Sequence, residues 1–200
     1  MSGASDSPWL IGTDPARSVV EGLGAEFHGV PCIVLDPLWS DGARLEEWRD
    51  SARVGPQLRS VVVALWPIRP VRRTLVELDL EEWVGTVETR LAWWFAALTA
   101  ASERTAEGGQ VVAVVDRPDP KDSAGWGVES AVADAVDVMA RSLAQLHRPR
   151  GVRVNVVATP ARLTGAPAPS LIGVIGAVRM LLSDDAEGVT ATTVVADGGH

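Results

Sequence analysis

Short apolar runs rich in β-branched residues alternate with longer segments of helical spacing along this chain. The short runs predict strands, because most of them lack the polar positions that a solvent-facing strand would show. They span residues 9–12, 31–36, 59–65, 110–116, 152–158 and 190–196. The segments between them predict helices at about 15–26, 43–53, 80–102, 127–147 and 170–183. This alternation predicts an α/β fold, a doubly wound parallel sheet of about six strands with helices on both faces.

The two longest predicted helices, at 80–102 and 127–147, each have two apolar faces. Asp79 and Glu82 form a capping-box pattern at the start of the first helix. One face of each helix carries large apolar side chains, and the other carries mostly small ones. The sheet can cover only one face, so we expect the other to contact a second subunit. The residues predicted at this interface are Trp93, Ala96, Ala97, Ala100, Ala133, Ala140 and Ala144.

Composition limits the classes of function that fit the chain. Its 200 residues suit a single domain, with residues 1–7 flexible ahead of the first strand. The net charge of -8 leaves no basic surface, so we expect neither nucleic acid nor a membrane as a partner. The first residues carry no cationic or long apolar segment, which favours a cytoplasmic protein. His28 and His147 have no ligand-spaced partners, so we expect no metal site.

Several segments resemble the short-chain dehydrogenases/reductases, in particular members similar to 3-oxoacyl-ACP reductases. The resemblance rests on residues 80–91, 108–115, 141–144, 151–158 and 181–199. It implies a Rossmann-type fold, here in a shortened form. It also implies that the two long helices form the main contact between subunits.

The resemblance also identifies positions where active members of this family carry their catalytic residues. Those members use a tyrosine, a lysine, a serine and an asparagine to hold the substrate oxygen and move its proton. This chain contains no tyrosine. The family's asparagine, serine, tyrosine and lysine positions are occupied by Arg90, Asp116, Glu129 and Ala133. We therefore expect the family's catalytic site to be absent.

The segment that matches the family's dinucleotide-binding turn departs from the pattern as well. The TGxxxGxG motif lets the backbone approach a pyrophosphate at a helix N-terminus. Only Gly12 remains here, and Asp14 and Pro15 predict the start of a helix whose amides a carboxylate already occupies. Trp66 stands where the family's NNAG motif follows a strand. Asp36 is either a remnant of an NAD ribose contact or an ordinary strand-ending turn. We expect no bound cofactor.

Altered site motifs on a retained scaffold predict a pseudoenzyme. It would be no enzyme by itself, and would pair with an active paralogue in a hetero-oligomeric dehydrogenase/reductase and support that subunit's structure or substrate pocket. A homodimer is the alternative assembly. The chain contains eight tryptophans, and five of them are expected around the former cleft and the two long helices: Trp66, Trp83, Trp93, Trp94 and Trp126. These five either plug the former cleft or anchor an interface.

Two other functions stay open. One is a small-ligand-binding or regulatory module that reuses the cleft. The other is a non-redox enzyme that uses Asp116 and Glu129. It requires these two carboxylates to lie close together, with at least one perturbed pKa.

Overall fold

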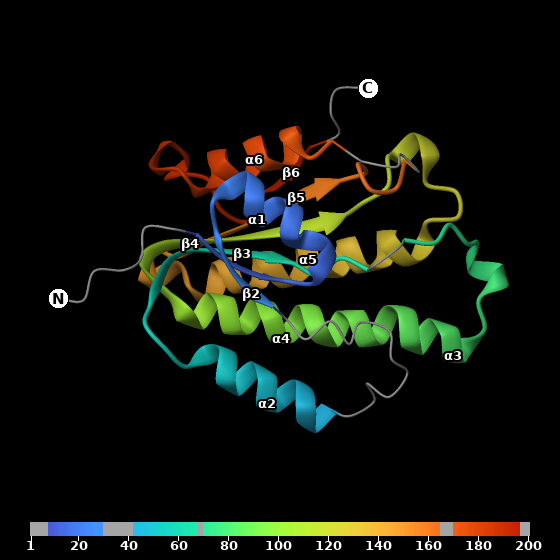
Figure 1. The fold of residues 1–200 in the computed structure, drawn as a ribbon, viewed down its shortest axis with the longest axis horizontal. Coiled ribbons are helices and arrows are strands. Elements are labelled where there is room, and N and C mark those ends of the chain that lie inside the picture. The colour runs from blue at the N-terminus through green and yellow to red at the C-terminus, as the bar shows by residue number, and fades with distance from the viewer. Residues whose placement is uncertain (1–7, 30–41, 68–69, 165–169, 197–200) are drawn as a thin grey trace.

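The computed structural model describes residues 8–29, 42–67, 70–164 and 170–196, so the predicted segment 1–7 and the predicted strand 31–36 with Asp36 lie outside the described residues. Six parallel strands form one sheet in the order β2-β1-β3-β4-β5-β6. They are β1 (Trp9–Gly12), β2 (Glu26–Gly29), β3 (Leu58–Ala64), β4 (Thr105–Asp116), β5 (Arg153–Thr159) and β6 (Thr193–Val195). Helices cover both faces (Figure 1), which confirms the predicted doubly wound fold.

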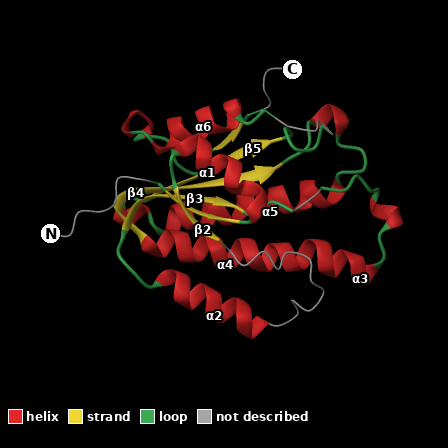
Figure 2. Cartoon of the chain, in the orientation of Figure 1, coloured by secondary structure: helices red, strands yellow, loops and turns green. Residues whose placement is uncertain are grey.

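Two groups of helices enclose the sheet (Figure 2). The helices are α1 (Arg17–Leu23), α2 (Gly42–Arg53), α3 (Leu80–Trp83), α4 (Thr89–Arg104), α5 (Gly127–Leu146) and α6 (Ile172–Leu182). Helices α1 and α6 pack on one face, whereas α4 and α5 pack on the other, with α2 outside α4. Side chains of β4 alternate between these two cores: Val111 and Ala113 face α4 and α5, and Val112 and Val114 face α1 and α6. The absence of polar positions in the strands therefore follows from burial on both sides.

The first predicted helix and the strand after it differ from expectation. A helix at 15–26 was predicted, but α1 ends at Leu23, where Gly24 adopts a left-handed conformation with φ of 64°. Glycine takes this conformation without steric cost and commonly ends a helix. Glu26 consequently begins β2, which pairs with β1, five residues ahead of the predicted strand 31–36.

The segment predicted as one helix at 80–102 contains an irregular turn. Its start is confirmed, because the Asp79 carboxylate accepts the Glu82 N–H at 2.8 Å. Val84–Glu88 then form a π-helical turn between α3 and α4. Such turns widen a helix locally and occur often at functional sites.

The small-residue faces of α4 and α5 lie inside the chain. The seven residues predicted at a subunit interface, Trp93, Ala96, Ala97, Ala100, Ala133, Ala140 and Ala144, are each at most 7% exposed. Helix α2 covers part of α4, where Trp48 meets Trp93 edge-on with ring centroids 5.6 Å apart. The two long helices also pack against each other and the sheet. The prediction of a subunit contact is therefore wrong for these residues. They are core residues of one chain, because α2 and the packing of α4 on α5 cover the face that was expected to contact a second subunit.

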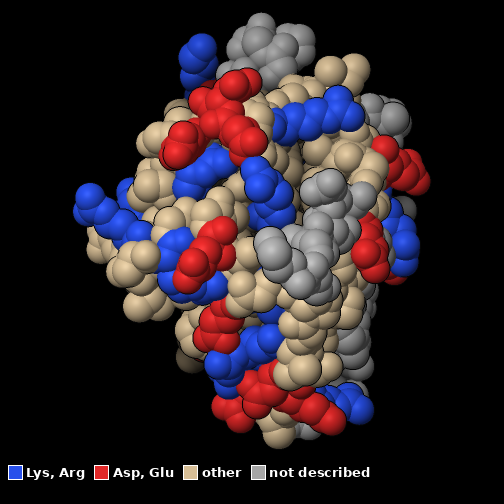
Figure 3. All heavy atoms as spheres, turned by 90° about the vertical axis from the view of Figure 1, so that its left-hand side faces the viewer, with Lys and Arg blue, Asp and Glu red and all other residues tan. Residues whose placement is uncertain are grey.

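The face at the amino ends of the strands carries charges of both signs in close mixture (Figure 3). One of its ion pairs joins Arg59 to Asp184 at 2.7 Å. This mixture gives no single-sign patch of the kind that attracts nucleic acid. Among the described helices, none is both long and apolar enough to cross a membrane.

A buried arginine holds the end of α6 against the sheet. Arg153, on β5, donates to the carbonyl oxygens of Leu181 at 3.1 Å, Ser183 at 3.1 Å and Ala186 at 2.6 Å. Its side chain is buried, so no water replaces these bonds if it is removed.

We expect Arg153→Leu to lower the free energy of unfolding by about 3 kcal/mol, because three carbonyl groups lose their donor in a buried place. Urea unfolding followed by circular dichroism measures the loss. Arg59→Leu, which removes an exposed ion pair near the same helix end, is the matched control and should cost less than about 1 kcal/mol. Equal losses in the two variants would contradict the assigned role of Arg153.

Candidate active site

Charged side chains gather at the carboxyl ends of β4 and β5, the edge where open parallel sheets bind ligands. Asp116 is the last residue of β4, and Arg162 lies in the loop after β5. An oxygen of the Asp116 carboxylate accepts a hydrogen bond from Nη1 of Arg162 at 2.6 Å. The two side chains are 1% and 9% exposed. This is a buried ion pair, in which each charge depends on the other for stabilisation.

A second buried pair lies beside the first. Arg90, near the start of α4, donates from Nη1 to Glu129 Oε1 at 3.3 Å, and these side chains are 11% and 4% exposed. The charges of Arg90 and Glu129 both act on Asp116. We call Arg90, Asp116, Glu129 and Arg162 the charged cluster.

Three of the four positions that the resemblance identified therefore come together. Arg90, Asp116 and Glu129 share one buried region although they lie far apart in the sequence. Ala133, one turn after Glu129 on α5, lies in the apolar core instead. The two carboxylates lie near enough for the charge of Glu129 to act on Asp116.

Burial changes the protonation of Asp116. Desolvation raises the pKa of this carboxyl group from 3.8 to about 6. Arg162 and Arg90 oppose the rise, whereas the negative charge of Glu129 adds to it. Desolvation also lowers the pKa of Arg162. Asp116 consequently gains or loses a proton near pH 6.

Three polar atoms of the charged cluster have no hydrogen-bond partner among the described residues. They are Nε of Arg90, Oδ1 of Asp116 and Oε2 of Glu129. A buried polar atom without a partner costs about 1–3 kcal/mol, so such atoms are rare in closed structural networks. The charged cluster therefore has hydrogen-bonding capacity left for a ligand or water.

Arg162 also organises its surroundings, and sequence reasoning missed it. Its guanidinium lies 4.7 Å from the centroid of the Trp66 ring and donates to the Pro67 carbonyl oxygen at 2.5 Å. Together with the bond to Asp116, these contacts join the ends of β3, β4 and β5. The sequence offered no signal for this role, because an arginine in a loop after a strand is ordinary.

Trp66 is a buried part of this edge. Its indole N–H donates to the Val114 carbonyl oxygen at 3.1 Å. Its backbone N–H and C=O both bond to the Thr13 hydroxyl, at 2.9 Å and 2.7 Å. Trp66 thus links the end of β3 to β4 and to the turn after β1, in agreement with the plug alternative for this tryptophan.

NAD(P) is the cofactor that the fold family implies, and the turn after β1 does not fit its phosphates. The Thr13 N–H donates to the Ala64 carbonyl oxygen, and the Ala16 N–H donates to the Thr13 carbonyl oxygen. Pro15 has no N–H. The Asp14 carboxylate, which pairs with Arg17 at 3.1 Å, would repel a phosphate. Few amides therefore remain for an anion, and we derive no chemical step through a dinucleotide.

Close packing around Gly12 explains why this position is a glycine. A Cβ atom on this residue would lie 2.5 Å from Leu10 Cδ2 and 3.1 Å from the Ala64 carbonyl oxygen. Its retention therefore needs no bound cofactor.

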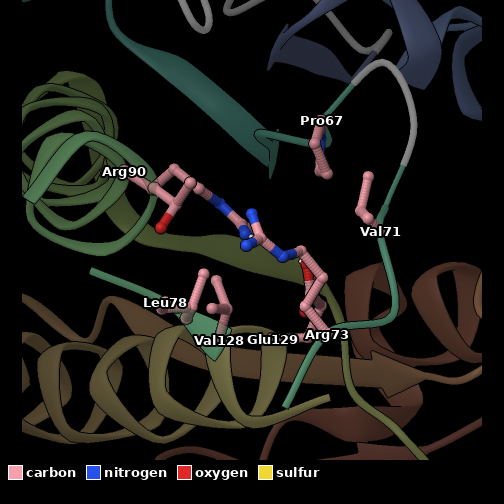
Figure 4. A pocket seen from close by; sticks show the side chains of 8 residues that line it. Pro67, Val71, Arg73, Leu78, Arg90, Val128 and Glu129 are labelled. Carbon is pink, nitrogen blue, oxygen red and sulfur yellow. Dashed lines mark hydrogen bonds and ion pairs between the residues drawn. The ribbon is translucent and has the colours of Figure 1, made fainter. Parts of the chain in front are cut away.

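A pocket of about 180 Å³ opens beside the charged cluster (Figure 4). Its lining residues are Pro67, Val71, Arg73, Leu78, Thr86, Arg90, Val128 and Glu129. In Figure 4 Arg90 extends into it from α4, with apolar side chains around it. The Arg73 side chain pairs with Glu82 at 2.6 Å. The backbone N–H of Arg73 donates to the Gly125 carbonyl oxygen at 2.7 Å. The loop before α3 is thereby fixed over the start of α5 as one wall of the pocket.

The two histidines that were weighed as metal ligands make other contacts. His28 stacks on Trp9, with ring centroids 4.4 Å apart, and His147 bonds to Ser102 at 3.1 Å. No group of three or more metal-binding side chains occurs within the described residues.

The titration of Asp116 predicts a pH-dependent stability difference. A carboxyl group whose pKa is raised on folding binds its proton more tightly in the native state, so its stabilising effect is present below pH 4 and is lost as the pH rises to about 6. Asp116→Asn cannot titrate. Relative to the natural chain, we expect this variant to gain up to about 3 kcal/mol in the free energy of unfolding between pH 4 and pH 7.

Urea unfolding at several pH values measures this difference. The exposed Asp185→Asn variant is the control for a change of charge alone. A difference between Asp116→Asn and the natural chain that stays constant across the pH range would show that burial does not raise the pKa of Asp116.

Comparisons with known proteins concern the fold. No protein-family model matches the chain, and no curated protein matches its sequence. Solved structures do match. A small-chain dehydrogenase matches with a TM-score of 0.69 and 15% identity, over 98% of both chains. A short-chain dehydrogenase/reductase from Mycobacterium ulcerans has a TM-score of 0.72 and 17% identity, over 98% of this chain and 90% of that chain. A blue fluorescent protein from a metagenomic library, in complex with NADPH, has a TM-score of 0.68 and 20% identity, over 98% of this chain and 87% of that chain.

These comparisons correct one expectation. Several structures that share the fold are named as dehydrogenases or reductases, and two others are complexes with NADPH. The prediction that the chain is no enzyme by itself is contradicted by them. It rested on the absence of the family's catalytic residues and of its dinucleotide-binding motif. This chain therefore has the Rossmann-type fold that these short-chain dehydrogenase/reductase structures share.

Proposed function

We propose that this chain is a non-redox enzyme that moves a proton on a small molecule bound in the pocket beside the charged cluster. The observation that carries the proposal is the position of Glu129. Glu129 lines the pocket, its side chain is buried, and one of its carboxylate oxygens has no hydrogen-bond partner among the described residues. The enzyme class of the proteins that share the fold supports an enzyme here as well.

The geometry favours removal of a proton from a carbon atom next to a carbonyl group. The Glu129 carboxylate takes the proton, and the C–H electron pair moves to the carbonyl oxygen as an enolate. The positive charge of Arg90, which lines the same pocket, stabilises that oxygen. Return of the proton to the same or a neighbouring atom completes the cycle without an oxidant or reductant.

Asp116 and Arg162 act indirectly, through the Arg90–Glu129 pair. Neither lines the pocket, but both influence the electrostatics of Arg90 and Glu129 from a buried position. Arg162 also holds Pro67, which lines the pocket, through its carbonyl oxygen. Asp116 and Arg162 are therefore positioning residues in this scheme.

Exchange with deuterated water tests the proposal. The natural chain is incubated in D2O with a set of small carbonyl compounds, and proton NMR follows the loss of signals next to the carbonyl group. We expect exchange of at least one compound, and a fall of about a hundredfold or more in its rate with Glu129→Gln, because the base is removed.

The exposed Glu81→Gln variant, on α3, is the matched control and should exchange at the natural rate. Thermal unfolding of each variant verifies that it is folded. No exchange with any compound, or an unchanged rate with Glu129→Gln, would contradict the proposal. Substrate-dependent consumption of NADPH by the natural chain would instead make it a redox enzyme.

We also propose that the chain associates through α4 and α5 with a second chain of the same fold, either an active paralogue or another copy of itself. Phe95 and Val138 are 49% and 58% exposed on these helices. They border a groove of about 260 Å³ whose floor includes Leu98, Met139 and Leu143. Exposed large apolar side chains around a groove favour a protein contact.

Replacement of Phe95 by Glu tests this association, because a charge in the groove opposes burial. We expect the natural chain to elute from size-exclusion chromatography with light scattering as a dimer, alone or with an added paralogue, and Phe95→Glu to elute as a monomer. Val76→Glu places a charge on a fully exposed valine elsewhere and should leave assembly unchanged. A natural chain that stays monomeric under both conditions would contradict the proposal.

A further inference from the structure

The lining of the pocket combines an apolar wall with a polar end. Pro67, Val71, Leu78 and Val128 supply the apolar wall. Arg90 and Glu129 lie at the polar end (Figure 4). The volume of about 180 Å³ limits a ligand to on the order of ten non-hydrogen atoms. A ligand that matches this lining is small and mostly apolar, with one polar group.

The charges that border the pocket are balanced in pairs. Arg90 pairs with Glu129, and Arg73 pairs with Glu82. An anionic ligand would bring a second negative charge to the Glu129 carboxylate, and a cationic ligand would bring a second positive charge to Arg90. Either would leave an uncompensated charge in a place with little water, which is costly. The pairing therefore favours an uncharged ligand.

The free atoms of the Arg90–Glu129 pair define the polar group. Among the described residues, Nε of Arg90 is a donor without a hydrogen-bond partner, and Oε2 of Glu129 is an acceptor without one. Both side chains line the pocket but both atoms are buried, so a ligand reaches these atoms only when the two side chains shift. A ligand that satisfies both must present an acceptor beside a donor.

We infer that the pocket binds a small, uncharged, mostly apolar molecule in which a carbonyl oxygen lies next to an N–H or O–H group, as in a carboxamide. The carbonyl oxygen accepts from Arg90, the neighbouring N–H or O–H donates to Glu129, and the alkyl part lies against Pro67, Val71 and Val128. This inference rests on the proposed function for the location of the site, and it adds the chemical class of a ligand that binds there. The N–H or O–H of that ligand occupies the Glu129 oxygen that takes the proton in the proposed reaction, so the ligand competes with the substrate.

A series of probes with one shape tests the inference. Isobutyramide offers both an acceptor and a donor, methyl isopropyl ketone offers the acceptor alone, isobutyrate is an anion and isobutylamine is a cation. Binding to the full chain is measured by ligand-observed NMR titration. We expect isobutyramide to bind at least about tenfold more tightly than each of the other three. Equal or tighter binding of the anion, the cation or the ketone would overturn the inference, as would a failure of all four probes to bind.

A change of charge in the pocket gives a second, independent outcome. In Glu129→Gln the positive charge of Arg90 is no longer balanced, so isobutyrate should gain about tenfold or more in affinity and overtake isobutyramide. Glu81→Gln, outside the pocket, should keep the natural order of affinities. An unchanged order in Glu129→Gln would also overturn the inference.

Failure of the inference and failure of the proposed function are distinguishable. Tight binding of isobutyramide without any deuterium exchange supports the ligand class and contradicts the proposed chemistry. Deuterium exchange that occurs only with charged substrates supports the chemistry and overturns the ligand class.

Discussion

The buried ion pair between Asp116 and Arg162 is the contact on which the carboxyl edge of this sheet depends. A charge inside a protein is stable only when a partner compensates it, and removal of one partner leaves the other at high cost. The pair, 2.6 Å apart, fixes the loop after β5 onto the end of β4. From the same guanidinium, contacts reach Trp66 and Pro67 after β3. Three separate loops thus keep their places through one side chain, and one wall of the pocket depends on it.

The electrostatics of the site follow from how these charges are arranged. Arg90 and Glu129 alone would form an ordinary buried pair. Asp116 brings a second carboxylate into the same region, and burial together with the Glu129 charge raises its pKa to about 6. The charged cluster therefore contains one carboxyl group, Asp116, that titrates near pH 6. A purely structural network has no need of this property, and its free hydrogen-bonding atoms would be a net cost.

The sequence predicted the strands of the fold well because their valine runs have no polar face. Four of the six predicted strands lie within a few residues of β1, β3, β5 and β6, and a fifth lies within the longer β4. The end of α1 could not be placed as well, because a glycine after a helical segment either continues or ends it, depending on its φ. For α4 and α5 the two apolar faces were recognised, but the partner of the second face was not. Only the fold brings α2 against Trp93.

The candidate site was predicted in part. The resemblance pointed to Arg90, Asp116 and Glu129, and the structure brings all three together. It could not reveal Arg162, since that residue lies in a loop and acts only through contacts with distant segments. The pocket could not be predicted from the sequence either, because its wall includes a loop that the Arg73–Glu82 pair holds in place. A pattern of residue types carries no information about such long-range contacts.

A continuous chain of contacts links the turn after β1 to the charged cluster. Thr13 bonds to both backbone groups of Trp66, the Trp66 indole bonds to β4, and Arg162 lies over the Trp66 ring while it holds Asp116. A turn that opened to admit a pyrophosphate would have to break the Thr13 bonds and would release Trp66 from its place under Arg162. The chain of contacts therefore makes a closed turn at β1 and a charged site at β4 mutually dependent. It also explains why the open pocket lies on the side of α4 and α5, next to Arg90 and Glu129, where that chain of contacts ends.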